Sequence, residues 1–151
     1  PYWRDDARGM IAGLSRGSKP AHVARAALDS VAYQVRDVFD AMALDTGEVP
    51  DILMADGGAS RNDQLMQFQA DILGKPVVRN LSADLSAIGA AWLAGLATGL
   101  WKSVSDLEQI PRQEDRFEPR CGGAQRDRLY AGWLESVARV LHDARAPKVT
   151  S

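Results

Sequence analysis

A short apolar run that leads through a pair of glycines into a helical pattern constrains the fold of this chain most. The run is Ile52-Leu53-Met54-Ala55, and Asp56-Gly57-Gly58 follows it directly. An apolar run without alternation fits a strand of a parallel sheet, because both faces of such a sheet are covered. Residues 61–73 are predicted to form the helix after the glycines, with Ser60 as N-cap, Asp63 completing a capping box and Gly74 ending it.

The rest of the chain continues this alternation of short β-compatible runs and longer helical runs. In the helical runs, apolar residues recur at steps of three and four. The alternation predicts an α/β fold with a parallel or mixed sheet and helices on its faces, although three short strands are few for four helices. Strands are predicted over 8–15 and 76–78, and helices over 20–44, 84–98 and 124–145.

Two of the predicted helices carry further information. The helix over 84–98 overlaps a stretch of seventeen uncharged residues, 85–101. This stretch is shorter than a membrane span, so we expect a helix buried in the core of a soluble protein. Residues 102–123 are predicted to be an irregular connection with one helical turn near Asp106. The helix over 20–44 is expected to end at Gly47 and to carry i,i+4 ion pairs between Arg25 and Asp29 and between Arg36 and Asp40.

Composition excludes several classes of protein. The 151 residues include 18 basic and 20 acidic side chains, for a net charge of −2, which argues against binding to nucleic acid or to a membrane surface. Cys121 is the single cysteine and forms no intrachain disulfide, and the two histidines, His22 and His142, lie far apart and give no metal-ligand cluster. We therefore expect a cytoplasmic protein without a metal site in this chain.

The Gly57–Gly58 turn is the candidate ligand site. In an α/β sheet, ligands bind at the carboxyl ends of the strands, where glycines let them touch the backbone and the next helix offers free N–H groups. Asn62 carries both a donor and an acceptor and is placed to reach the edge of a base. The alternative is that the glycines only make a tight turn and that Asn62 is solvated. The turn matches neither the dinucleotide fingerprint nor the P-loop.

Other polar residues are interpreted as structural. Asp56 precedes a glycine turn, and an aspartate there is more often a turn former than a general base or metal ligand. The polar stripe on the helix over 61–73 is interpreted as its exposed face; its members are Gln64, Gln67 and Asp71. His22 and His142 are expected on helix surfaces.

Four sets of residues together form a recognisable pattern. They are Pro1-Tyr2-Trp3 with Ala7-Arg8-Gly9 and 13–17, Asp56-Gly57-Gly58-Ala59 with Asn62 and 65–74, the helix over 87–97, and Tyr130-Ala131-Gly132-Trp133. These stretches resemble the C-terminal part of glycerol kinases, within the FGGY family of carbohydrate kinases. The resemblance covers the chain from Pro1 to about Leu141 and is most specific over 56–74.

The resemblance implies an actin-like, ribonuclease-H-type ATPase fold of two lobes with the active site in the cleft between them. Residues 1–146 would be an incomplete C-terminal lobe that holds its later strands and helices, and residues 147–151 a frayed tail. In the family, a Gly-Gly-Ala turn and the asparagine after it contact the adenine and ribose end of ATP. These roles fall on Gly58, Ala59 and Asn62, with Gly57 supporting the turn.

The resemblance also implies an activity for the full-length protein, the transfer of the γ-phosphate of ATP, with Mg²⁺, to glycerol to give glycerol 3-phosphate. The catalytic aspartate and the polyol-binding residues belong to other parts of such kinases, so we expect no catalytic residue in this chain and no activity from it alone. A homo-oligomer is expected, and nucleic acid and membrane are not expected partners. Two alternatives stay open: a kinase of the same family that acts on another polyol or ketose, and a non-catalytic nucleotide-binding or interaction module.

Overall fold

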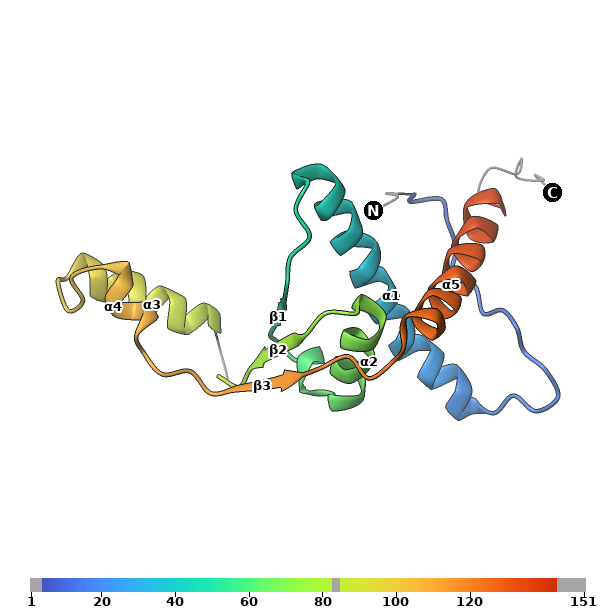
Figure 1. Cartoon of the computed structure of the whole chain (residues 1–151), viewed down its shortest axis with the longest axis horizontal. Helices are drawn as coiled ribbons and strands as arrows, with labels where there is room; N and C mark the ends of the chain where they lie inside the picture. Colours follow the sequence, from blue (N-terminus) through green and yellow to red (C-terminus); the bar gives the residue numbers. More distant parts are fainter. Residues whose placement is uncertain (1–3, 83–84, 144–151) are drawn as a thin grey trace.

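A computed structural model describes residues 4–82 and 85–143 of the chain (Figure 1). The predictions for Pro1-Tyr2-Trp3 and for residues 147–151 lie outside the described residues. In chain order the elements are α1 (Pro20–Thr46), β1 (Leu53–Ala55), the 3₁₀ turn η1 (Ala59–Arg61), α2 (Asp63–Leu73), β2 (Val77–Asn80), α3 (Leu85–Ala97), α4 (Val104–Glu108), β3 (Glu114–Phe117) and α5 (Gly123–Asp143).

The described strands form a mixed sheet in the order β1-β2-β3. β1 runs parallel to β2, with Leu53 opposite Val77, and β3 runs antiparallel to β2, with Phe117 opposite Val77. The predicted α/β class with a parallel or mixed sheet is confirmed. β3 lies in the stretch that the sequence predicted as an irregular connection, because its Glu-Asp-Arg-Phe sequence has no apolar alternation.

The strand predicted over 8–15 is wrong. These residues run as exposed, irregular chain, and Ile11 and Leu14 are each 62% exposed. A strand exists only when a neighbour accepts its backbone hydrogen bonds, and the described sheet pairs β2 with β1 and β3 and leaves residues 8–15 outside it.

The core forms where α2 contacts both α1 and the sheet. Leu65, Met66 and Ala70 of α2 join Ala32 of α1 and Val77 of β2 in one buried cluster. Both helices end at the glycines that the sequence predicted, because Gly47 (φ 73°) and Gly74 (φ 67°) adopt the left-handed conformation that terminates a helix. The predicted ion pairs of α1 are also present, Arg25–Asp29 at 2.6 Å and Arg36–Asp40 at 3.4 Å.

α3 differs from the buried helix that the sequence predicted. It projects with α4 away from the sheet (Figure 1). Within it only Gly95 is buried, and Leu93 is 69% exposed. Gly95 lies against the ring of Trp101, and Arg112 stacks on the ring of Trp92 at 5.3 Å. A glycine therefore allows a close approach here, but to a tryptophan and not to the sheet. Within the described ranges, no helix is both long and apolar enough to cross a membrane.

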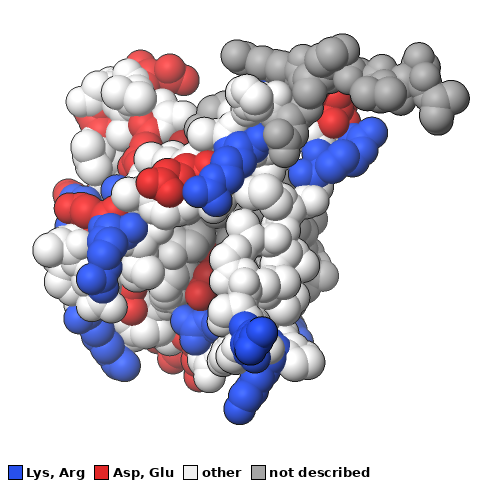
Figure 2. All heavy atoms as spheres, turned by 90° about the vertical axis from the view of Figure 1, so that its right-hand side faces the viewer, with Lys and Arg blue, Asp and Glu red and all other residues white. Residues whose placement is uncertain are grey.

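A buried carboxylate attaches α5 to α1. Asp37 of α1 is 8% exposed and accepts hydrogen bonds from Tyr130 Oη at 2.5 Å and from Trp133 Nε1 at 2.9 Å. Tyr33 stacks on Trp133 with ring centroids 5.3 Å apart. Figure 2 views the molecule from the side at the right of Figure 1, and basic and acidic side chains are interspersed on this face.

Candidate functional site

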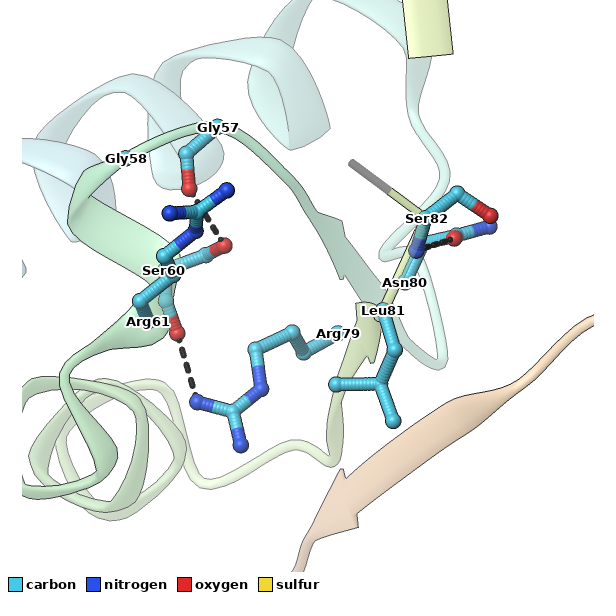
Figure 3. A pocket seen from close by; sticks show the side chains of 8 residues that line it. All are labelled: Gly57, Gly58, Ser60, Arg61, Arg79, Asn80, Leu81 and Ser82. Carbon is cyan, nitrogen blue, oxygen red and sulfur yellow. Dashed lines mark hydrogen bonds between the residues drawn. The ribbon is translucent and has the colours of Figure 1, made fainter. Parts of the chain in front are cut away.

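A cavity of about 270 Å³ opens at the carboxyl ends of the parallel strands β1 and β2 (Figure 3). This is the place where open α/β sheets bind ligands. The turn after β1 forms one wall, and the end of β2 with the residues after it forms the other. The lining residues are Gly57, Gly58, Ser60, Arg61, Arg79, Asn80, Leu81 and Ser82.

The two glycines of the turn differ in their backbone conformation. Gly57 has φ 81°, a left-handed conformation that L side chains rarely adopt, so the turn itself requires glycine there. Gly58 has φ −61° and ψ −40°, which is ordinary helical backbone, and a Cβ built on it would meet no atom within 4 Å. The chain therefore needs no glycine at Gly58 for its own conformation, although glycine in helical backbone costs about 0.5–1 kcal/mol relative to alanine.

The residues after the glycines wind into η1, and this moves the start of the next helix. Gly58 O accepts from Arg61 N at 3.3 Å, and Ala59 O accepts from Asn62 N at 3.2 Å. Ser60 is buried, and its hydroxyl donates back to Gly57 O at 2.8 Å. Ser60 is thus not the N-cap that the sequence predicted, and the helix begins at Asp63, not at residue 61.

Asn62 is the N-cap of α2. Its Oδ1 accepts from Leu65 N at 3.1 Å, which satisfies one of the free N–H groups of the first helical turn. Asn62 and Ala59 adjoin the cavity in sequence but are not among its lining residues, whereas Gly57 and Gly58 line it. The amide oxygen of Asn62 is used by the helix, so its amide nitrogen is the group to consider for a ligand.

Sequence reasoning missed Arg79, the buried guanidinium of this site. Its side chain is 10% exposed, and Nη1 donates to Ser60 O at 2.8 Å and to Asp63 Oδ1 at 2.7 Å. Nη2 bonds Asp115 of β3, and the guanidinium lies over the ring of Phe117 at 5.1 Å. Hydrogen bonds to Asp115 and then to Asp63 raise the pKa of Arg79. An arginine within the apolar sequence of a short strand was the available signal, but the predicted strand stopped at residue 78.

The polar stripe on α2, which was interpreted as an exposed face, partly binds another segment of the same chain. Gln67 Nε2 donates to Glu118 O at 2.8 Å. Asp71 Oδ1 accepts from the backbone nitrogens of Arg120 and Cys121 at 2.6 and 3.2 Å. These two side chains hold the connection between β3 and α5 against α2, whereas Gln64 is exposed as predicted.

The remaining predicted residues lie apart from the cavity. Asp56 is exposed and does not line it. His22 is exposed at the start of α1, where its Nδ1 accepts from Lys19 N at 3.2 Å, and His142 is exposed near the end of α5. Among the residues that the structure describes, no three histidine, cysteine, aspartate or glutamate side chains are grouped to hold a metal ion, and Cys121 is a free thiol.

The C-terminal domain model of the FGGY family of carbohydrate kinases matches residues 1–98. The chain belongs to this family. The matched residues include β1, the glycine turn, α2, β2 and α3, so the cavity lies within the family domain. This identification confirms the resemblance found in the sequence.

Individual members of the FGGY family extend the match beyond residue 98. The chain is 54% identical over 139 residues to a glycerol kinase of Pseudomonas savastanoi pv. phaseolicola, which covers 92% of this chain and 28% of that protein. It is 50% identical over 141 residues to a glycerol kinase of Caldanaerobacter subterraneus subsp. tengcongensis, covering 93% of this chain and 28% of that protein. The chain therefore spans little more than a quarter of the length of these relatives.

Solved structures of FGGY kinases share the fold. A crystal structure of Plasmodium falciparum glycerol kinase with ADP matches with a TM-score of 0.84 and 31% identity, over 93% of this chain and 28% of that one. Xylulose kinase from Rhodospirillum rubrum matches with a TM-score of 0.75 and 29% identity, over 93% of this chain and 29% of that one. The actin-like fold class and its incompleteness in this chain are thereby confirmed.

Proposed function

We propose that the protein containing this chain transfers the γ-phosphate of ATP to glycerol, giving glycerol 3-phosphate. The observation that carries the proposal is the 54% identity to a protein named glycerol kinase, over a stretch that contains the whole cavity. The related structure with ADP supports a nucleotide as the ligand. The chain spans about 28% of these relatives, so the activity is proposed for the full-length protein, in the cytoplasm and as a homo-oligomer.

Within this chain, we propose that Gly57, Gly58, Ala59 and Asn62 hold the adenosine end of ATP. The cavity of about 270 Å³ lies near the lower limit of small-molecule sites, which suits a part of a nucleotide. Gly58 leaves open space where a side chain would stand. The charge of Arg79 is already paired by Asp63 and Asp115, which suits a neutral group such as a nucleoside, while the exposed Arg61 adds a positive charge at the rim.

The role of this chain in the reaction would be positioning. When bound, ATP supplies the phosphoryl group, and its transfer depends on alignment and charge neutralisation more than on covalent chemistry with the protein. The turn would fix the nucleoside end. Since the described residues offer no group of metal ligands, Mg²⁺ would be held by the phosphates of ATP and by other parts of the enzyme.

Two alanine variants of the full-length protein test the placement. Gly58→Ala should leave the melting temperature unchanged or raise it slightly, because φ −61° suits alanine, which is favoured over glycine in helical backbone by about 0.5–1 kcal/mol. It should raise the KM for ATP roughly tenfold, since a methyl group forced into a filled site costs about 1–3 kcal/mol. Gly57→Ala is the matched control for damage to the turn, and it should lower the melting temperature, because left-handed backbone costs a non-glycine residue about 1–2 kcal/mol. An unchanged KM for ATP in Gly58→Ala would refute the adenosine placement.

The substrate is tested separately with a panel of polyols and ketoses. Turnover of glycerol supports the proposal. The likeness to xylulose kinase favours one rival, a ketose kinase, which turnover of xylulose without turnover of glycerol would establish. Binding of ATP without turnover of any substrate would instead support a non-catalytic nucleotide-binding module.

A further inference from the structure

Arg79 lines the cavity and bonds the turn that forms its opposite wall. It stands on β2, donates to the carbonyl of Ser60 in η1 and to Asp63 at the start of α2, and bonds Asp115 on β3. Figure 3 shows its side chain reaching from the end of β2 toward Ser60. One planar group therefore joins four elements that are separate in the sequence.

A second hydrogen bond relays this contact to the glycines. Ser60 accepts from Arg79 through its carbonyl oxygen and donates through its hydroxyl to Gly57 O at 2.8 Å. Ser60 is 4% exposed, so water does not replace these bonds easily. Two bonds in series thus connect Arg79 with the glycine turn that we assign to the nucleoside.

The geometry requires arginine in particular. A guanidinium presents donors in a rigid planar fork, which here spans a carbonyl and one carboxylate on Nη1 and a second carboxylate on Nη2. A lysine ammonium is a single point at the end of a flexible stem and does not reach all three oxygens at once. Among the described side chains, Arg79 Nε is buried without a hydrogen-bond partner, so the site is built around the two terminal nitrogens.

We propose that Arg79 is a positioning residue that holds the Gly57–Arg61 turn from β2 and so keeps the cavity preformed for the nucleoside end of ATP. Arg79 acts through Ser60 and touches no reacting atom. The inference rests on the proposed function, because its effect on catalysis passes through the nucleotide site.

The test is Arg79→Lys in the full-length enzyme, which keeps the charge and removes the fork. We expect the KM for ATP to rise at least fivefold, the KM for glycerol to stay within twofold, and the melting temperature to fall. Asp115→Asn, which leaves the Arg79–Ser60 bond in place, should raise the KM for ATP less than Arg79→Lys does.

Arg36→Lys is the matched control. Arg36 is 17% exposed, donates through Nη1 to Ile72 O at 3.0 Å, pairs with Asp40, and lies over the ring of Tyr130 at 3.8 Å. Arg36 is therefore also a structural arginine. It bonds the C-terminal end of α2, whereas Arg79 bonds the N-terminal end. Arg36→Lys should lower the melting temperature without changing the KM for ATP.

The outcomes separate this inference from the proposed function. If Arg79→Lys and Arg36→Lys change the KM for ATP equally, while Gly58→Ala raises it, the positioning role is overturned and the adenosine site stands. If Gly58→Ala leaves the KM for ATP unchanged, the adenosine site fails and the inference fails with it. A selective rise in both Gly58→Ala and Arg79→Lys supports the two together.

Discussion

Asn62 has two separable roles, and one pair of substitutions distinguishes them. Its Oδ1 caps α2 by accepting from Leu65 N at 3.1 Å, whereas its amide nitrogen is the donor that the adenosine assignment needs. Asn62→Ala removes both groups. Asn62→Ser removes the amide donor and keeps an oxygen that caps helices about as well as asparagine does.

The magnitudes follow from these contacts. Loss of an N-cap costs about 0.5–2 kcal/mol, so Asn62→Ala should destabilise the domain by about 1 kcal/mol even without nucleotide, while Asn62→Ser should change stability little. Loss of one hydrogen bond to a ligand costs about 1 kcal/mol, which corresponds to roughly a fivefold weaker interaction. Both variants should therefore raise the KM for ATP about fivefold and leave the KM for glycerol unchanged.

The assay combines kinetics of the full-length enzyme with hydrogen exchange at the Leu65 amide. That amide should exchange faster in Asn62→Ala and at the wild-type rate in Asn62→Ser, because the cap bond is lost only in the first. An Asn62→Ser enzyme with the wild-type KM for ATP would refute the nucleotide contact. Equal exchange of Leu65 in wild type and Asn62→Ala would refute the cap.

Two further predictions concern the chain by itself and its behaviour at high pH. The 151-residue chain alone should form no ADP from ATP in the presence of glycerol, because none of the described residues that line the cavity is a carboxylate and Asp56 is exposed and does not line it. Glycerol-dependent ADP above the level of a mock purification would contradict this. Burial and the hydrogen bond to Asp37 raise the pKa of Tyr130 in the folded chain, whereas an unfolded tyrosine ionises near pH 10. The contribution of this bond to stability should therefore be complete below about pH 10 and decline above it. Tyr130→Phe should flatten the loss of stability measured by urea denaturation between pH 9 and 11, and an unchanged slope would contradict the assignment. Tyr33→Phe is the comparison, because burial also raises the pKa of the half-buried Tyr33, but without a bond to Asp37.

Features set by local chemistry were predictable from the sequence. Gly47 and Gly74 end α1 and α2 because glycine adopts positive φ at low cost, and the apolar run before Gly57 forms β1 next to the turn it leads into. The candidate turn was located for the same reason. Its cavity at the carboxyl ends of β1 and β2 follows from the strand–turn–helix order.

Features set by distant partners were not predictable in this way. β3 is a strand because β2 offers it an edge, and its charged sequence gives no sign of this. Arg79 lies in the site because Asp115, 36 residues away, and Asp63 neutralise it. The capping box expected at Ser60 failed because that hydroxyl bonds backward to Gly57, which left Asn62 to cap α2.

The bonds from α2 to the connection before α5 have a consequence for the order of folding. Asp37 and Tyr130 are 93 residues apart in the sequence, whereas Asp71 and Arg120 are 49 apart. Closing a long flexible loop slows folding much more than it lowers stability, since the entropy cost grows only with the logarithm of loop length. Tyr130 lies only nine residues after Cys121. Once Asp71 binds the backbone of Cys121, α5 is therefore held near α1, and the loop that must still close is short. We therefore expect a weaker bond at Asp71 to slow the docking of the last helix more than it changes the contacts of the finished fold.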